Sequence, residues 1–192
     1  MKPDTTPSPD APDVRILHRD CPFRGCLVGV HVDRLLLPDG SEAVREVVVH
    51  PGAVAIVAIP SPGSVLLVRQ YRHPAESYVW EIPAGKLEPD ESPFDCARRE
   101  LEEETGYRAS KWTPLASFFT TPGFSNEKIS LFCARSLSRV RRSPDHDVTS
   151  CRSFLARDLQ EMFDRGDLAD AKTLLGLLWV ELLSGGYGDR EC

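Results

Sequence analysis

Residues 85–107 read GKLEPDESPFDCARRELEEETGY, and this stretch decides how the rest of the chain is interpreted. Ser92 is a suitable N-cap, Pro93 suits the first helical position, and Asp95 stands where a capping-box acid would lie. Gly106 supplies a left-handed stop at the other end. The pattern therefore predicts a helix that begins at Pro93 and ends before Gly106.

Two kinds of side chain recur at helical spacing within this predicted helix. The apolar ones form a stripe that we expect to be buried: Phe94, Ala97 and Leu101. The acidic ones lie beside it within roughly 100° of arc: Glu100, Glu103 and Glu104. Like charges four residues apart cost a helix about 0.2–0.5 kcal/mol, and a divalent cation bound by carboxylate oxygens would offset that cost. The alternative is a solvated acidic face, which is what most charge runs are.

The complete spacing of this segment favours the cation. Gly85 is followed after five residues by Glu91, and seven residues later by the run from Arg99 to Tyr107, RELEEETGY. This spacing resembles the Nudix box of the Nudix hydrolases, and every fixed position of that pattern is matched.

Composition indicates one globular domain of ordinary size. The chain has 192 residues, 41% hydrophobic and 27% charged, with a net charge of −6, which disfavours binding to nucleic acid or to an anionic membrane. The six cysteines show no metal-ligand spacing, and no segment is apolar enough for export or for spanning a bilayer. We therefore expect reduced thiols, a cytoplasmic location, no nucleic-acid partner and no membrane partner.

The chain is expected to have three parts. Residues 1–14 are rich in proline and aspartate and predict a disordered tail. Residues 15–50 contain a turn signal, Pro38-Asp39-Gly40, and predict a small antiparallel sheet with strands near 26–32 and 43–49. Such a sheet is too thin to be stable alone and should lie on the rest of the chain or on a second copy. Residues 51–192 form the remaining domain.

Mixed strands and helices in that domain predict an α/β sandwich. AVAIVAI at 53–59 reads as a strand buried on both faces. Further strands are expected at 65–68, 78–82, 115–119 and 128–134, a polar stretch at 135–150, and helices at 159–163 and 170–183. The last helix is expected to pack through Leu174, Leu175, Leu178 and Leu182.

Segments outside the box resemble one branch of the superfamily, the ADP-ribose pyrophosphatases. They are REVVVHPGAVAIV (45–57), VRQYRHP (68–74), VWEIPAGKLE (79–88), TPGFSNEKISLF (121–132) and DAKTLLGLL (170–178). The resemblance implies a Nudix fold, an α/β/α sandwich with a mixed sheet plus a small N-terminal antiparallel sheet. It also implies a homodimer whose N-terminal sheets exchange between subunits.

For the reaction, the resemblance implies hydrolysis of the pyrophosphate of ADP-ribose to AMP and ribose 5-phosphate, with Mg²⁺ or Mn²⁺ as cofactor. Glu100 and Glu104 would be the principal metal ligands, together with the Ala84 carbonyl. Glu103 would be a further ligand or would hold a metal-bound water. Arg99 would orient the carboxylates by bidentate pairing.

The sequence leaves the general base open. This branch often places a glutamate on a loop after the box, but residues 143–150 contain no glutamate and offer Asp145 and Asp147. Three options follow: one of these aspartates is the base, Glu103 is the base, or a metal-bound hydroxide needs little help.

Substrate contacts are implied at several positions. Three residues match positions where the branch contacts adenosine and phosphates, although strand-edge salt bridges would also explain them: Arg45, Glu46 and Arg69. Glu127 could meet the terminal ribose, and Pro122 matches a proline linked to ADP-ribose preference. Phe23 is the only aromatic near the position where the branch stacks a ring on the adenine, and it is slightly displaced.

Other functions fit parts of the pattern. The substrate could be another nucleotide sugar or a dinucleotide polyphosphate, such as GDP-mannose, UDP-glucose or diadenosine polyphosphate. Alternatively the chain could be a non-catalytic Nudix ligand sensor, although such sensors usually carry a degraded box and a DNA-binding helical domain. A purely structural dimer module would leave the carboxylate cluster unexplained.

Overall fold

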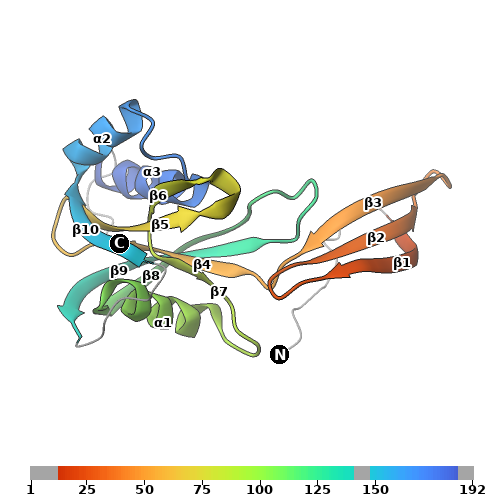
Figure 1. The fold of residues 1–192 in the computed structure, drawn as a ribbon, viewed down its shortest axis with the longest axis horizontal. Coiled ribbons are helices and arrows are strands. Elements are labelled where there is room, and N and C mark those ends of the chain that lie inside the picture. Colours follow the sequence, from red (N-terminus) through yellow and green to blue (C-terminus); the bar gives the residue numbers. More distant parts are fainter. Residues whose placement is uncertain (1–12, 141–147, 186–192) are drawn as a thin grey trace. The chain divides into compact units, whose positions relative to one another are not determined.

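A computed structural model describes residues 13–140 and 148–185, with side chains as far as residue 180 (Figure 1). The chain forms two compact units. The first consists of the residues through Gly52 together with 88–90 and 118–128, and the second contains the rest. No helix within the described ranges is both long enough and apolar enough to cross a bilayer.

The first unit is built on a three-stranded antiparallel sheet in the order β1-β2-β3. Its strands are β1 (Arg15–Arg24), β2 (Gly29–Leu36) and β3 (Glu42–Val49). The predicted turn between β2 and β3 is confirmed, since Leu37 N–H donates to Ser41 O at 2.8 Å and Gly40 adopts φ +83°. The loop of 120–127 pairs with β3, where Val48 N–H donates to Phe124 O at 2.7 Å.

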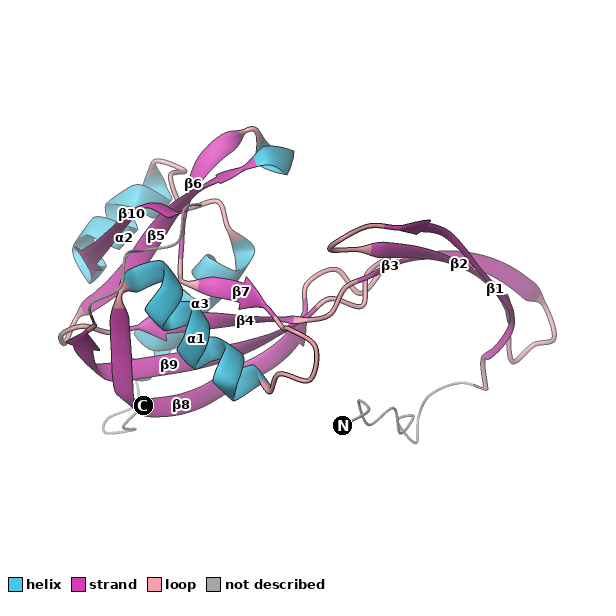
Figure 2. Cartoon of the chain, turned by 60° about the horizontal axis from the view of Figure 1, so that its bottom comes forward, coloured by secondary structure: helices cyan, strands magenta, loops and turns pink. Residues whose placement is uncertain are grey.

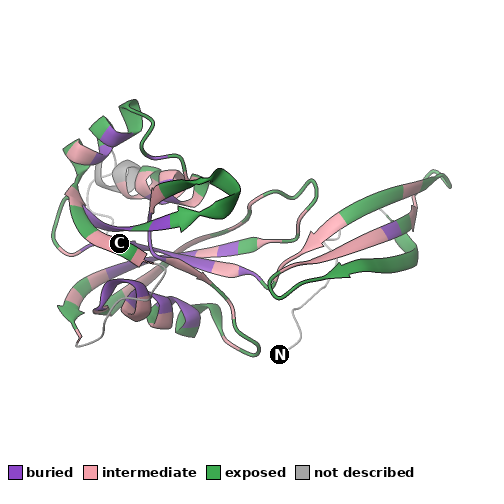
Figure 3. Ribbon diagram, viewed as in Figure 1, coloured by how far each residue is buried: buried purple, intermediate pink, exposed green. Residues whose placement is uncertain are grey.

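The expected first strand was wrong in position. Residues 25–28 form a turn in which Gly25 N–H donates to Val28 O at 2.9 Å, and β2 begins only at Gly29. A whole strand, β1, precedes that turn. Every residue of β1 is exposed in the single chain (Figure 3), so no buried face existed from which a period of two could be read.

The second unit contains two sheets, ordered β10-β5-β6 and β7-β4-β9-β8. The strands are β4 (Ala53–Ala58), β5 (Ser64–Arg72), β6 (Ser77–Glu81), β7 (Ala84–Lys86), β8 (Tyr107–Phe119), β9 (Lys128–Arg139) and β10 (Val148–Leu155). The helices are α1 (Pro93–Thr105), α2 (Ala156–Asp164) and α3 (Ala171–Gly185), with a short 3-10 turn η1 (His73–Ala75). The strands β4 and β9 run parallel, whereas β4 and β7 run antiparallel.

The core lies on both faces of β4, as its continuous apolar sequence predicted. Val54 and Ile56 pack with Leu101 of α1 in one buried cluster. Val57 faces the other side, where a Cβ added at Gly176 of α3 would lie 2.9 Å from its Cγ2 atom. Helices therefore cover β4 from both sides (Figures 1 and 2), and the predicted α/β sandwich with a mixed sheet is confirmed. Burial of a side chain such as Leu101 stabilises the fold by about 1.5–3 kcal/mol.

Two local expectations were wrong. Phe94 is 42% exposed and contacts Trp112 edge-on, and Cys96 takes its place in the buried stripe. Leu178 is 55% exposed, and the side chain of Leu182 lies outside the described residues. The polar stretch at 135–150 contains the end of β9 and the start of β10, which pairs with β5.

Candidate active site

The predicted box helix is confirmed as α1 and starts and ends where its signals lie. Ser92 Oγ accepts from Asp95 N–H at 3.2 Å, and the Ser92 hydroxyl donates to Asp95 Oδ2 at 2.6 Å. At the other end Gly106 adopts φ +70°, and its N–H donates to Glu102 O at 3.0 Å. These caps fix the two ends of the helix. Its side chain Glu104 lies next to β5 and β7, where Gln70 and Ala84 donate to it.

Glu104 is the more deeply held of the two predicted principal ligands, with 5% of its surface exposed. Gln70 Nε2 donates to its Oε1 at 2.6 Å, and Ala84 N–H donates to its Oε2 at 3.0 Å. Burial, together with the charge of Glu100, raises the pKa of Glu104 to about 7 against the lowering effect of these two donors. The folded chain thus keeps a carboxyl whose ionisation a nearby cation would favour.

Arg99 connects three carboxylates of the box. Its Nε and Nη2 donate to Glu91 at 2.8 and 2.9 Å, a bidentate pair. Its Nη1 donates to Glu100 at 2.7 Å and to Glu103 at 2.9 Å. Burial raises the pKa of Glu100, while Arg99 acts in the opposite direction and neighbouring carboxylates add to the rise. Arg99 therefore orients the acids, as the resemblance implied.

Gly85 allows the strand before the helix to approach Glu100. A Cβ at Gly85 would lie 1.9 Å from Glu100 Cδ and 2.0 Å from its Oε1, which no packed atom tolerates. At the next residue of β7, Lys86 O lies 3.3 Å from the Cys96 thiol of α1. Burial raises the pKa of that thiol to about 12. The start of the box is thus packed directly on α1.

A buried ion cluster lies at the end of β6. Glu81, 2% exposed, accepts from Arg72 Nε and Nη2, both at 2.7 Å, and also from Lys172 Nζ. Burial alone would raise the pKa of Glu81, but Arg72 and Lys172 outweigh it, and the pKa is lowered. Lys172 also donates to Asp170 at 2.9 Å. The cluster fixes the strand that leads into Ala84.

Sequence reasoning missed the roles of the residues behind the acids: Gln70, Arg72, Lys172 and Thr173. Gln70 and Arg72 lie in VRQYRHP, and Lys172 and Thr173 lie in DAKTLLGLL, both of which carried the family resemblance. The resemblance identified both segments but did not predict which residues of one contact the other. Alternation along β5 was the available signal, because it predicts that Gln70 and Arg72 share one face.

The donor set fits a divalent metal ion in its chemistry. Glu100 and Glu104 offer hard carboxylate oxygens on one turn of α1, and a carboxylate with two donors retains further lone-pair directions. In the geometry of the described residues, no three His, Cys, Asp or Glu side chains are grouped as a metal would require. Arg99 Nη1 instead brings Glu100 and Glu103 together as a pair.

Four of the five predicted substrate-contacting residues belong to the first unit. Arg45 and Glu46 are exposed on β3, and Pro122 is exposed in the 120–127 loop. Glu127 Oε2 accepts from Thr120 Oγ1 at 2.7 Å, and its Oε1 lies 3.7 Å from Nδ1 of His50. Their association with the acids of α1 stays a prediction.

The fifth predicted contact, Arg69, lies on β5 beside Gln70. Its guanidinium stands 4.6 Å from the centroid of the Tyr78 ring. Because neighbouring strand residues point to opposite faces, Arg69 points away from the face on which Gln70 reaches Glu104. The suggested bases Asp145 and Asp147 lie outside the described residues, so the assignment of the base stays open.

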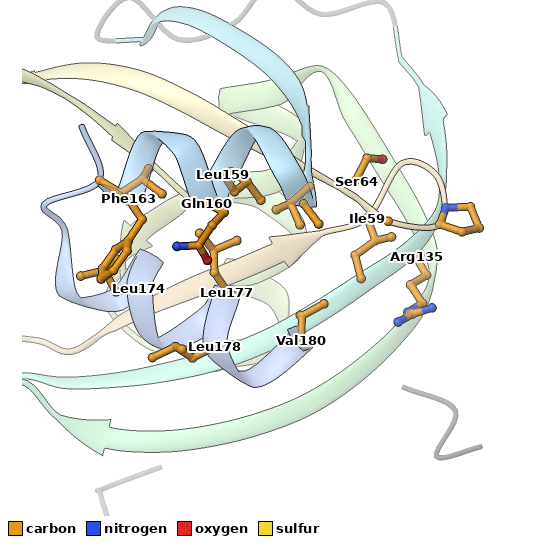
Figure 4. A pocket seen from close by; sticks show the side chains of 15 residues that line it. Ile59, Ser64, Arg135, Leu159, Gln160, Phe163, Leu174, Leu177, Leu178 and Val180 are labelled. Atoms are coloured by element: carbon orange, nitrogen blue, oxygen red, sulfur yellow. The ribbon is translucent and has the colours of Figure 1, made fainter. Parts of the chain in front are cut away.

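A separate cavity of about 440 Å³ lies between α2, α3 and the start of β5 (Figure 4). Its walls are mainly aliphatic and aromatic, including Ile59, Leu159, Phe163, Leu174 and Leu177. No acidic side chain is among the described residues that line it. It is therefore not the place where a metal-bound diphosphate would be held.

Comparison with known proteins gives three results. The family model for the NUDIX domain matches residues 49–175. The chain is 39% identical over 163 residues to the ADP-ribose pyrophosphatase of Bacillus subtilis (strain 168), and 40% identical over 163 residues to the methanol dehydrogenase activator of Bacillus methanolicus. Each alignment covers 83% of this chain and 88% of the relative. The crystal structure of an ADP compounds hydrolase superposes with a TM-score of 0.78 at 26% identity, covering 90% of this chain and 95% of that one.

Proposed function

This chain belongs to the Nudix family, and we propose that it hydrolyses the pyrophosphate of ADP-ribose to AMP and ribose 5-phosphate. One observation carries the proposal: Glu100 and Glu104 are buried on one face of α1, directly against Ala84 and Gly85 of β7. A relative of similar length that is named ADP-ribose pyrophosphatase, and a structural neighbour named ADP compounds hydrolase, support this substrate.

Nudix hydrolases generally require a divalent metal ion, and we propose Mg²⁺, with Mn²⁺ as a substitute. Glu100, Glu104 and the Ala84 carbonyl would hold the ion, with Glu103 as a further ligand. When bound, such an ion neutralises phosphate charge and lowers the pKa of water. Arg99 keeps Glu100 and Glu103 close together before the ion arrives.

The proton from the attacking water needs an acceptor, and three candidates stay open: Glu103, an aspartate of the 145–147 segment, or a metal-bound hydroxide acting without help. Glu103→Gln, Asp145→Asn and Asp147→Asn separate them by their kcat values. If both aspartate variants keep wild-type kcat, the base is not on that segment.

We further propose that Arg45, Glu46 and Arg69 contact the adenosine and phosphates, Arg69 from the face of β5 opposite to Gln70, and that Glu127 and Pro122 face the terminal ribose. Each is accessible for such a contact, since all except Glu127 are exposed and Glu127 is half-buried. Alanine at Arg45 or Glu127 should raise KM for ADP-ribose more than it lowers kcat.

A homodimer in the cytoplasm is proposed as the working form. The single-chain sheet of the first unit exposes several apolar side chains, which a second copy would cover: Val14, Ile16, Leu17, Phe23, Leu27 and Val44. The described cysteines are free thiols, as a reducing compartment would keep them. A monomeric mass by light scattering at micromolar concentration would contradict the dimer.

Turnover of a substrate panel tests the function. Purified protein with Mg²⁺ is given ADP-ribose, GDP-mannose, UDP-glucose and diadenosine polyphosphates, and the products are measured. We expect ADP-ribose to give the highest kcat/KM, EDTA to abolish turnover, and Glu104→Gln to lower kcat by about 10³-fold. Higher kcat/KM for another substrate would reassign the specificity, and tight ADP-ribose binding without turnover would favour the sensor.

A further inference from the structure

Gln70 is a buried polar side chain that lies next to the carboxylates of the box. It is 7% exposed and lies on the face of β5 that also carries Leu66, which packs in the cluster with Leu101 of α1. Alternation along the strand thus carries its amide toward the same helix. There it meets Glu104, which lies one turn after Glu100.

Two donors from different elements hold the carboxylate of Glu104. Gln70 Nε2 from β5 donates to Oε1 at 2.6 Å, and Ala84 N–H from β7 donates to Oε2 at 3.0 Å. A glutamate side chain reaches its carboxylate through several rotatable bonds, and two donors on opposite oxygens fix both the position and the plane of that group. Ala84 alone would leave the carboxylate free to turn about one hydrogen bond.

We propose that Gln70 is a positioning residue that holds the carboxylate of Glu104 in the orientation for binding a divalent metal ion; this inference rests on the proposed function. A neutral amide suits this role because it donates a hydrogen bond without cancelling the negative charge of Glu104. The nearby cation on the same face, Arg72, is instead directed to Glu81 by two hydrogen bonds. Arg72 therefore compensates the charge of Glu81, while Gln70 orients the carboxylate of Glu104.

The test compares metal binding in the free protein with turnover. Gln70→Met keeps the length and apolar bulk of the side chain but removes the N–H donor. Mn²⁺ titrated into the full-length protein, without substrate and followed by electron paramagnetic resonance, reports affinity independently of activity. Loss of a partner behind a metal ligand typically weakens affinity about 10–100-fold, and we expect that range for Gln70→Met. We expect kcat for ADP-ribose to fall as well, with KM changed less than about twofold.

Gln160→Met is the matched control, since Gln160 is an exposed glutamine of α2 whose amide donates to Asp164 at 2.9 Å. It should bind Mn²⁺ as the wild type does. If Gln70→Met does not fold, Gln70→Asn carries the test, because its shorter side chain withdraws the amide from Glu104 while keeping a polar group. Wild-type Mn²⁺ affinity in a folded Gln70→Met or Gln70→Asn protein overturns the inference and leaves the proposed function intact. Failure of the wild type itself to bind Mn²⁺ overturns both, and Mn²⁺ binding without ADP-ribose turnover overturns only the proposed function.

Discussion

The backbone N–H of Ile82 donates a hydrogen bond to Thr173 Oγ1 at 2.9 Å, which joins the end of β6 to the first turn of α3. Thr173 is fully buried, and its hydroxyl in turn donates to Asp170 Oδ2 at 2.5 Å. Ala84, which donates to Glu104, follows Ile82 by two residues. The C-terminal helix therefore supports the loop at which the proposed metal site begins.

Thr173→Val should destabilise the protein by about 1–3 kcal/mol, because it leaves the buried Ile82 N–H without its acceptor at nearly constant volume. Urea unfolding measures the loss. Thr149→Val is the control, since the exposed Thr149 hydroxyl donates to Arg69 O at 2.9 Å, and its effect should stay within about 0.5 kcal/mol. An equal loss of unfolding free energy in the two variants would mean that the hydrogen bond from Ile82 to Thr173 stabilises the protein no more than an exposed one.

Gly85→Ala should lower kcat by about 10²-fold with the fold retained, because the new Cβ displaces the Glu100 carboxylate from its position beside Arg99. Steady-state turnover of ADP-ribose and circular dichroism measure the two effects. Gly29→Ala is the matched control, since a Cβ at Gly29 would lie 3.5 Å from Phe23 O, an ordinary contact. A Gly85→Ala enzyme with wild-type kcat would show that Glu100 relocates without consequence.

The stability of the metal-free protein should depend on pH through Glu104. Its pKa rises from 4.5 to about 7 on folding, so between these values the folded state holds a proton that the unfolded state has lost. The stabilisation that comes from the protonated Glu104 is therefore fully present below pH 4.5 and is lost as the pH rises to about 7. The free energy of unfolding should fall by at most about 3 kcal/mol over this range.

The measurement is urea unfolding in EDTA at several pH values for the wild type and for Glu104→Gln. The difference between the two proteins should change across pH 4.5 to about 7 and be constant above it. Saturating Mg²⁺ should reduce the change, because metal binding favours the ionised carboxylate. A difference that is independent of pH in EDTA would mean that Glu104 titrates normally.

Thiol reactivity should separate the cysteines by burial. In a Cys192→Ser background, the exposed Cys21 and Cys26 should react with a disulfide reagent at pH 8 within minutes. Cys96, whose pKa burial raises to about 12, should react only on unfolding. Mass spectrometry of the labelled peptides identifies the sites. Fast labelling of Cys96 in the native protein would show that β7, which is packed on α1, separates readily from the helix.

Much of the second unit could be predicted because its signals are local. Ser92 and Gly106 mark the ends of α1, and the unbroken apolar run at 53–59 marks the strand with helices on both faces. The spacing of Glu100 and Glu104 placed both acids on one side of the helix, where they are buried. Short-range periodicity is enough for such elements.

Long-range pairing could not be predicted in the same way. The contact between Gln70 and Glu104 depends on which sheet face meets α1, and the contact between Thr173 and Ile82 depends on where α3 packs. Phe94 has helical spacing with Leu101 but lies near the helix end, where its ring is exposed and meets Trp112. Periodicity reports a face of an element and not the partner that covers it.

The parallel pairing of β4 with β9 has a consequence for biosynthesis. Ala53 lies opposite Ile129, and the box helix and β8 are both translated between these two partners. A nascent chain stalled before β9 emerges from the ribosome would carry every acid of the box. It would still lack the strand that pairs with β4 in the sheet β7-β4-β9-β8. Nascent chains of increasing length should therefore acquire protease resistance abruptly, once β9 has left the exit tunnel, rather than in step with the helix.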